Sequence, residues 1–213
     1  MPARSKVEVK GLEARFYDAL MNLITLGKYE GFIRQAIADL QLTADDVVMD
    51  LGAGTGKNAE LMLRTMGTGG KVYALEIGAE MLEQLQQRQQ NDSRIHILNQ
   101  RIDEPFQLPE PATVAFISFV LHGFEQEDRI KIIENVRNNL TSGGRFCILD
   151  YNHFSVDDSP WYVRFAIRKV ECELAEDFIN RDWPTILREY GFEQDDEKLY
   201  FRNYVRLLCS RKV

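Results

Sequence analysis

Hydrophobic and polar positions alternate between two spacings along the chain, and these spacings predict strands and helices in turn. Short apolar runs bounded by glycine or polar residues predict buried strands at residues 47–51, 72–76, 95–98, 113–120 and 146–149. Between them, apolar residues three and four positions apart predict helices at residues 57–66, 79–90 and 126–140. Strands separated by such helices need crossover connections, so we expect an α/β fold with a Rossmann-like, doubly wound and mostly parallel sheet.

Two further regions predict helical additions to this core. Residues 13–40 have apolar residues three and four positions apart, which predicts N-terminal helices with a break at Gly27 and Gly31. Residues 151–190 contain both tryptophans and a mixed-charge stretch over residues 161–178 that predicts one helix. We expect this second region to form an inserted helical lid.

The last segment, residues 191–213, predicts two strands, at residues 192–200 and 203–209, with little chain between them. A short connection can join only antiparallel neighbours, so we expect a terminal antiparallel strand in the otherwise parallel sheet. The chain of 213 residues is then a single domain, residues 1–213, built around a core over residues 45–150.

Composition and charge exclude several classes of protein. With 45% hydrophobic and 28% charged residues, the chain has an ordinary globular balance. Its net charge of −7 disfavours general binding to the phosphate backbone of nucleic acids. No apolar run is long enough to predict a membrane span, and residues 1–10 lack the apolar core of a signal peptide. We therefore expect a cytoplasmic protein.

The cysteines predict neither a metal site nor a disulfide framework. Cys147, Cys172 and Cys209 are scattered along the chain and form no CxxC pair. We expect free thiols in a reducing compartment and no bound metal.

The strongest local signal is the segment DLGAGTG at residues 50–56, which directly follows one predicted strand and precedes a predicted helix. Glycines at positions 52, 54 and 56 let the backbone turn sharply and let a ligand approach the main chain. In open α/β sheets, ligands bind at the carboxyl ends of the strands, which is where this loop lies.

The glycine spacing distinguishes between nucleotide ligands. A dinucleotide fold requires GxGxxG, but Lys57 stands where its third glycine belongs. A P-loop requires an opening glycine and a closing hydroxyl residue, but Leu51 and Asn58 occupy those positions. Glu76, at the end of the second predicted strand, offers a carboxylate for both hydroxyls of a ribose. The pattern therefore predicts a nucleoside-containing ligand and argues against a nicotinamide-dependent dehydrogenase.

Four segments carry a resemblance to a known family, namely residues 47–58, 72–78, 112–124 and 135–151. In order and spacing they resemble the class I S-adenosylmethionine-dependent methyltransferases. The segment FYDALMNLITLG, residues 16–27, is similar to the ubiquinone/menaquinone-biosynthesis C-methyltransferases within that class. The resemblance implies S-adenosyl-L-methionine as cofactor and S-adenosyl-L-homocysteine as product.

The resemblance also implies roles for matching residues. The methionine part of the cofactor would contact the glycine loop. The ribose would bind to Glu76, and the adenine would contact Ile77 and Ile102. The sulfonium would lie near Phe119 and Leu121, with Tyr17 over the cofactor. The implied cofactor-binding residues are Tyr17, Asp50, Gly52, Ala53, Gly54, Gly56, Glu76, Ile77, Ile102, Phe119 and Leu121.

One position departs from the family pattern. Many members carry an acidic residue after the third strand that faces the adenine amino group, and Arg101 stands there in this chain. Either the Ile102 backbone and Asp103 take over this recognition, or the contact is missing.

Methyl transfer from a sulfonium is an in-line displacement, so the protein mainly supplies position and electrostatics. A general base is needed only where the acceptor must lose a proton. His122 and His153, each following a strand at the carboxyl edge, are the candidate catalytic residues, whereas His96 inside a strand predicts a structural role.

The sequence favours a small-molecule acceptor that is quinone-like, aromatic or lipid-like. An aromatic set in the lid could line its pocket or form a small core of its own: Trp161, Tyr162, Phe165 and Trp183. Alternatives are methylation of a protein, an RNA or a phospholipid head group, and a non-catalytic module that only binds the cofactor. The acceptor atom and the formation of a homodimer stay open.

Overall fold

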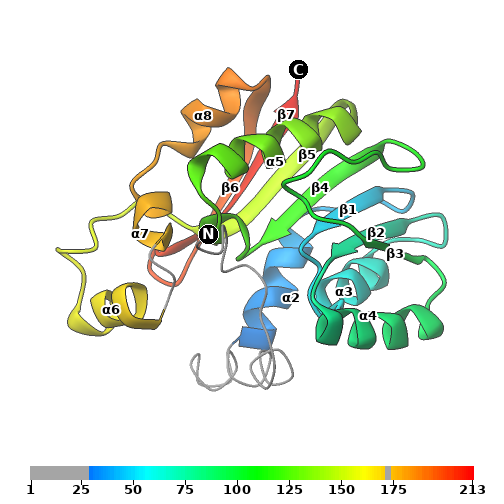
Figure 1. The fold of residues 1–213 in the computed structure, drawn as a ribbon, viewed down its shortest axis with the longest axis horizontal. Helices are drawn as coiled ribbons and strands as arrows, with labels where there is room; N and C mark the ends of the chain where they lie inside the picture. The colour runs from blue at the N-terminus through cyan, green and yellow to red at the C-terminus, as the bar shows by residue number, and fades with distance from the viewer. Residues whose placement is uncertain (1–28, 171–173) are drawn as a thin grey trace, which may run out of the picture.

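A single seven-stranded sheet organises the protein in the computed structural model, which describes residues 29–170 and 174–213. The strand order is β3–β2–β1–β4–β5–β7–β6 (Figure 1). The strands are β1 (Val47–Leu51), β2 (Lys71–Glu76), β3 (Ile95–Asn99), β4 (Ala112–Ser118), β5 (Leu140–Tyr151), β6 (Phe192–Tyr200) and β7 (Val205–Lys212). The first five strands are parallel, and β7 inserts antiparallel between β5 and β6. The predicted Rossmann-like fold class is confirmed.

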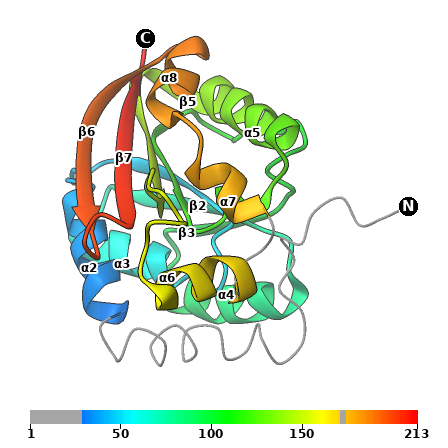
Figure 2. The same ribbon diagram turned by 90° about the vertical axis from the view of Figure 1, so that its left-hand side faces the viewer.

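Helices cover both faces of the sheet (Figures 1 and 2). One face carries α2 (Tyr29–Asp39), α3 (Lys57–Thr65) and α4 (Ala79–Asn91), and the other carries α5 (Gln126–Asn139) and α8 (Trp183–Glu189). Each helix buries an apolar stripe in one of two core clusters. Because both faces are covered, the central strands β1 and β4 are buried along most of their length rather than at alternating positions.

The carboxyl ends of the parallel strands meet at one edge of the sheet, and the remaining helices gather there. This edge carries the short helical turn η1 (Leu121–Gly123) and the lid, which consists of α6 (Trp161–Phe165), the π-helical turn η2 (Ala166–Val170) and α7 (Leu174–Ile179). The topology therefore places the glycine loop, the end of β4 and the lid at the same edge of the sheet.

Some predicted element boundaries differ from the structure. The helix predicted over residues 161–178 is described in two parts, α6 with η2 and then α7, and residues 171–173 between them lie outside the described residues. Gly31 lies inside α2 and breaks nothing. The strand predicted at residues 146–149 begins at Leu140, directly after α5. Gly27 and the predicted helix before residue 29 lie outside the described residues.

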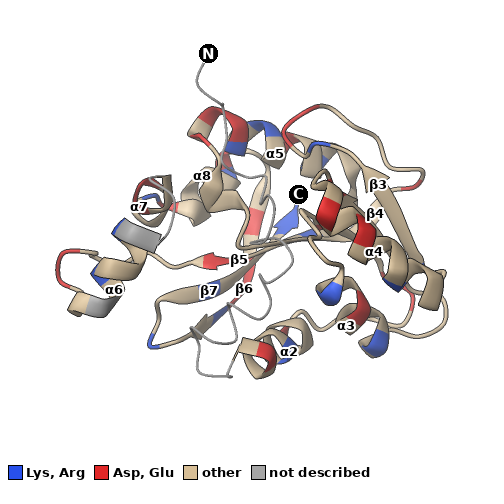
Figure 3. Ribbon diagram, turned by 60° about the horizontal axis from the view of Figure 1, so that its bottom comes forward, with Lys and Arg blue, Asp and Glu red and all other residues tan. Residues whose placement is uncertain are grey.

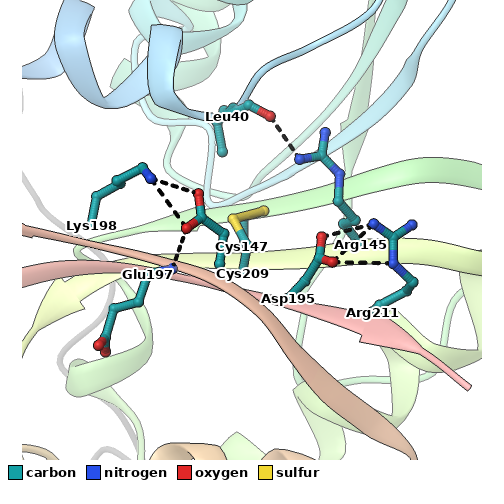
Figure 4. Close-up of a disulfide and its surroundings, with 9 residues drawn as sticks. Leu40, Arg145, Cys147, Asp195, Glu197, Lys198, Cys209 and Arg211 are labelled. Atoms are coloured by element: carbon teal, nitrogen blue, oxygen red, sulfur yellow. Dashed lines mark hydrogen bonds and ion pairs between the residues drawn. A yellow bond between two sulfur atoms is a disulfide. The ribbon is translucent and has the colours of Figure 1, made fainter.

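The expectation of free thiols is also wrong for two of the cysteines. Cys147 on β5 and Cys209 on β7 stand directly opposite each other in the antiparallel register and form a buried disulfide (Figure 4). They are 62 positions apart in the sequence, so only the long-range pairing of these strands brings them together. Cys172 lies outside the described residues.

Candidate cofactor and acceptor site

The glycine loop is a sharp turn fastened to the neighbouring strand. Gly52, Gly54 and Gly56 have φ angles of 72°, 55° and 79°, in the left-handed region that glycine adopts without strain. The backbone N–H groups of Gly52 and Ala53 both donate to the carbonyl of Leu75 on β2, at 2.9 Å each. The predicted loop residues therefore lie together at the carboxyl edge of β1, directly before α3.

Glu76 closes the loop from the end of β2. Its Oε2 accepts the backbone N–H of Gly54 at 2.8 Å, and its Oε1 accepts those of Ile77 and Gly78 at 2.8 and 2.7 Å. A carboxylate has about four lone-pair directions, so these three bonds fix its orientation and leave acceptor capacity toward a ligand. Glu76 therefore lies against the loop, and its role toward a ribose stays a prediction.

Asp50 is the most unusual group of the site. Its side chain is 1% exposed, and its Oδ2 accepts no hydrogen bond from any described residue. Burial, and secondarily the nearby charge of Glu76, raises the pKa of its carboxyl to about 7. A buried carboxylate oxygen that accepts no hydrogen bond is costly, and a ligand with a cationic donor would relieve this cost.

The adenine edge differs from the family pattern in a defined way. Arg101 donates to Asp103 at 2.6 Å, so the two charges compensate each other. Ile102 is buried, and its carbonyl accepts the side-chain amide of Asn135 at 2.9 Å. Asp103 is therefore engaged with Arg101, and the roles of Ile77 and Ile102 toward adenine stay predictions.

Phe119 follows β4 in a strained conformation. Its φ of 52° is rare for a residue with a side chain and costs on the order of 1–3 kcal/mol. Its ring is half-buried and lies 6.2 Å from that of Phe32 and 6.1 Å from that of Tyr151, measured between centroids. In contrast, the side chain of Leu121 is fully buried in the core beside α5, and Tyr17 lies outside the described residues.

His122 forms a buried pair with a residue that the sequence analysis missed. Its Nδ1 lies 2.8 Å from Oδ1 of Asp150 at the end of β5, and its backbone N–H donates to Oδ2 of the same carboxylate at 3.3 Å. The side chains are 10% and 1% exposed. The position of Asp150 at a strand end on the same edge was the signal that could have identified it.

Arg129 of α5, also missed, holds the backbone of this turn. Its buried guanidinium donates to the carbonyls of Leu121 and His122 at 3.2 and 3.0 Å. It also donates to the carbonyl of Leu174 and to the carboxylate of Asp177, both on α7, at 3.0 and 2.5 Å. The turn that carries His122 is therefore tied to the lid.

The remaining candidates are dispersed. His153 is exposed, and its Nδ1 bonds the carbonyl of Ile179 at 3.0 Å, whereas the exposed His96 lies beside Tyr73 on the far side of the sheet. Of the lid aromatics, Trp183 is buried and stacks on Phe178 with centroids 4.5 Å apart.

The other lid aromatics do not join Trp183. Trp161 and Phe165 are 73% and 58% exposed, and the side chain of Tyr162 lies outside the described part. The described residues thus do not form one aromatic pocket from this set. Within the same residues, no group of three metal-binding side chains occurs, and no helix has the length and apolar character needed to cross a membrane.

Comparisons with known proteins agree with this geometry. Residues 48–144 match a family model described as a methyltransferase domain. A ubiquinone/menaquinone biosynthesis C-methyltransferase of Stenotrophomonas maltophilia is 26% identical over 78% of this chain and 66% of its own length. A chloroplastic 2-phytyl-1,4-beta-naphthoquinone methyltransferase of Arabidopsis thaliana is 30% identical over 65% of this chain and 54% of its own. The chain thus spans between half and two thirds of these relatives.

Solved structures share the fold at low identity. A methyltransferase from Aquifex aeolicus has a TM-score of 0.61 at 18% identity, over 85% of this chain and 89% of its own. The glycopeptide N-methyltransferase MtfA in complex with S-adenosylmethionine has a TM-score of 0.64 at 17% identity, over 84% and 92%. These likenesses show that the chain shares its fold with S-adenosylmethionine-dependent methyltransferases, and residues 48–144 match a methyltransferase domain.

Proposed function

We propose that this protein binds S-adenosylmethionine and transfers its methyl group to a small aromatic acceptor. The observation that carries the proposal is the buried carboxylate of Asp50, whose Oδ2 has no donor among the described residues. The cofactor's amino group is a cationic donor of the kind that this carboxylate needs. The residues of the loop therefore fit the cofactor chemically.

Each part of the loop has a role in this proposal. When bound, the cofactor supplies a methyl group activated by a positively charged sulfur. Asp50 would hold the amino group, Glu76 would accept hydrogen bonds from the ribose hydroxyls, and Gly54 would allow close backbone approach. Phe119 would border the methyl group from the end of β4. These residues bind and orient, which is the main contribution that such a transfer requires.

An aromatic acceptor is supported by the walls of the carboxyl edge. Phe32 of α2 lies 6.2 Å from Phe119 and 4.7 Å from Phe201, centroid to centroid, and Tyr151 continues the series beyond Phe119. Such rings offer stacking surfaces to a planar apolar molecule. The names of the relatives point the same way, since both act on quinone-type compounds. We therefore propose a reduced quinone as the acceptor class.

Calorimetric titration with S-adenosylmethionine tests the cofactor. We expect micromolar binding by the wild type and at least a tenfold loss in Glu76→Ala. The matched control is Glu83→Ala, which removes the same charge from an exposed position of α4 and should bind as the wild type does. Absence of binding to the wild type would refute the proposal.

Methyl transfer is tested with reduced 2-phytyl-1,4-naphthoquinone and mass spectrometry, where we expect a product heavier by one CH₂. Cofactor binding without product from this or related hydroquinones would favour a non-catalytic module. Methylation of RNA is disfavoured by the surface, because in the view of Figure 3 basic and acidic residues of the described helices are interspersed. Many of the basic side chains are already paired, among them Arg64, Arg168 and Arg211.

A further inference from the structure

The pair of His122 and Asp150 defines the protonation pattern of the imidazole. An ionised carboxylate can only accept hydrogen bonds, so at 2.8 Å from Oδ1 the Nδ1 atom must carry the proton. In the neutral ring the lone pair then resides on Nε2. Asp150 is itself held, because Oδ1 also accepts the backbone N–H of Tyr151 at 2.8 Å and Oδ2 that of His122 at 3.3 Å.

The ring also has a fixed place. Its centroid lies 5.2 Å from that of Tyr151 at the end of β5 and 6.3 Å from that of Phe178 in α7. The backbone beneath it is held by Arg129, which donates to the His122 carbonyl at 3.0 Å. The imidazole therefore lies where the sheet edge meets the lid, on the side of Phe119 that Tyr151 occupies.

Among the described residues, charged side chains from several elements lie around the pair. On α5, Arg129 is 0% exposed, and on α7, Asp177 pairs with it and with Arg181. On β7, Arg206 stands opposite Asp150 in the register and pairs with Glu197 of β6 at 3.4 Å. Two buried guanidinium groups, those of Arg129 and Arg206, therefore interact electrostatically with the Asp150 carboxylate.

We propose that Asp150 is a positioning residue that fixes the orientation and tautomer of His122, so that Nε2 acts as general base toward the methyl acceptor. This inference rests on the proposed function and narrows its substrate class. A base is useful only where the acceptor gives up a proton, so the acceptor carries an ionisable hydroxyl on its aromatic ring. A hydroquinone meets this condition, whereas a thioether or a tertiary amine does not.

In this proposal, methyl transfer begins when the acceptor loses a proton. The hydroxyl proton of the acceptor moves to Nε2, which leaves an oxyanion and an imidazolium. The electron pair of the activated ring forms the new bond to the methyl carbon, while the bond between that carbon and sulfur breaks. The electrons of the broken bond remain on sulfur, which leaves as a neutral thioether. The hydrogen on the methylated ring carbon then leaves as a proton and a proton returns to the oxygen, so the aromatic hydroxyl is restored. One proton therefore leaves the acceptor for each methyl group gained, and the Asp150 carboxylate stabilises the imidazolium.

Nitrogen-15 NMR of the histidine rings tests the positioning directly and needs no acceptor. The chain has three histidines, so His→Gln variants assign every signal. We expect neutral His122 as the Nδ1–H tautomer in the wild type and a loss of this single tautomer in Asp150→Asn, because an amide cannot accept all three N–H groups. His96→Gln is the matched control and should leave the His122 signal unchanged. An Nε2–H tautomer in the wild type would overturn the inference without any variant.

Kinetics with the reduced naphthoquinone test the role in transfer. We expect kcat to fall about 10²–10⁴-fold in His122→Gly and at least tenfold in Asp150→Asn, with the Kd for S-adenosylmethionine within twofold of wild type. Added imidazole should partly restore the His122→Gly rate, which a merely structural role would not permit. If the wild type turns over and both variants keep its kcat, this inference fails while the proposed function stands. If the wild type fails to bind the cofactor, the proposed function itself fails.

Discussion

Asp50 makes cofactor affinity depend on pH. Because burial raises the pKa of its carboxyl to about 7, against 3.8 for an ordinary aspartate, the contribution of this carboxyl to the stability of the unliganded fold is largest below the ordinary value. That contribution is lost as the pH rises toward 7. Binding of a cationic amino group needs the ionised form and therefore follows the opposite trend. We expect about tenfold weaker binding at pH 6 than at pH 7.5, by calorimetry.

Asp50→Asn is the control for this pH effect. The amide does not titrate, so binding should be weaker than wild type at pH 7.5 and nearly constant down to pH 6. The amino group of the cofactor, with a pKa near 8, stays cationic over most of this window. A wild-type affinity that does not change between the two pH values would contradict the assignment of Asp50 as the amino-group partner.

Alanine substitutions at two glycines of the loop should distinguish an effect on cofactor affinity from an effect on protein stability. A Cβ at Gly56 would overlap the side chain of Leu85, whereas one at Gly54 would meet no protein atom within 4 Å. Both have a positive φ, which costs an alanine about 1 kcal/mol. We expect Gly54→Ala to lower the free energy of unfolding by about 1 kcal/mol. We expect its cofactor affinity to fall at least tenfold, because the added methyl group would block close approach of the cofactor to the main chain.

Gly56→Ala is the matched variant, and it should lose about 3 kcal/mol of unfolding free energy from strain and overpacking together. Urea unfolding and calorimetry measure the two quantities separately. A Gly54→Ala protein that binds S-adenosylmethionine as tightly as wild type would show that the cofactor does not pass over this residue.

At the level of elements, the disulfide closes a long segment. Cys147 and Cys209 are 62 positions apart and enclose the whole lid and β6. Restricting an unfolded chain over that length is worth about 4 kcal/mol in the chain-entropy model. We expect a reductant to lower the free energy of unfolding in urea by an amount of that order.

The double variant Cys147→Ala/Cys209→Ala separates the disulfide from general effects of the reductant. It should be less stable than the oxidised wild type and should not respond to reductant, even though Cys172 remains. Equal stability of the wild type with and without reductant would mean that the two sulfurs are not joined in solution.

The elements that could be predicted are those whose signal is local. The strand β1, the glycine loop and Glu76 could be found because period, turn residues and spacing all lie within 30 positions of sequence. The pair of His122 and Asp150 is separated by 28 positions and two elements, and the disulfide by 62. Such contacts depend on the order of the strands in the sheet, which a single sequence does not give. Asp150, the partner of His122, was therefore not predicted.

For the molecule as a whole, stability should be unevenly distributed. Two large apolar clusters hold helices to both faces of the sheet, whereas a small cluster of Val156, Ile167 and Ile179 anchors α6. The ion pairs of Arg168 with Asp157 and Glu176 are exposed and contribute about 0–1 kcal/mol each. In Figure 1, α6 lies apart from the sheet. This part of the lid should therefore open well below the free energy of global unfolding.

Hydrogen exchange read by mass spectrometry measures this difference. We expect peptides covering residues 152–170 to exchange orders of magnitude faster than those of β4 and β5. S-adenosylmethionine alone should protect the loop at residues 50–56 and leave the lid unchanged, because no residue of α6 belongs to the cofactor site. Adding the acceptor should then slow exchange in the lid, since its ring would lie between His122 and Phe119 beneath α7. If the cofactor alone slowed exchange in the lid, the lid would cover the cofactor. This result would contradict the expectation that the lid responds only to the acceptor.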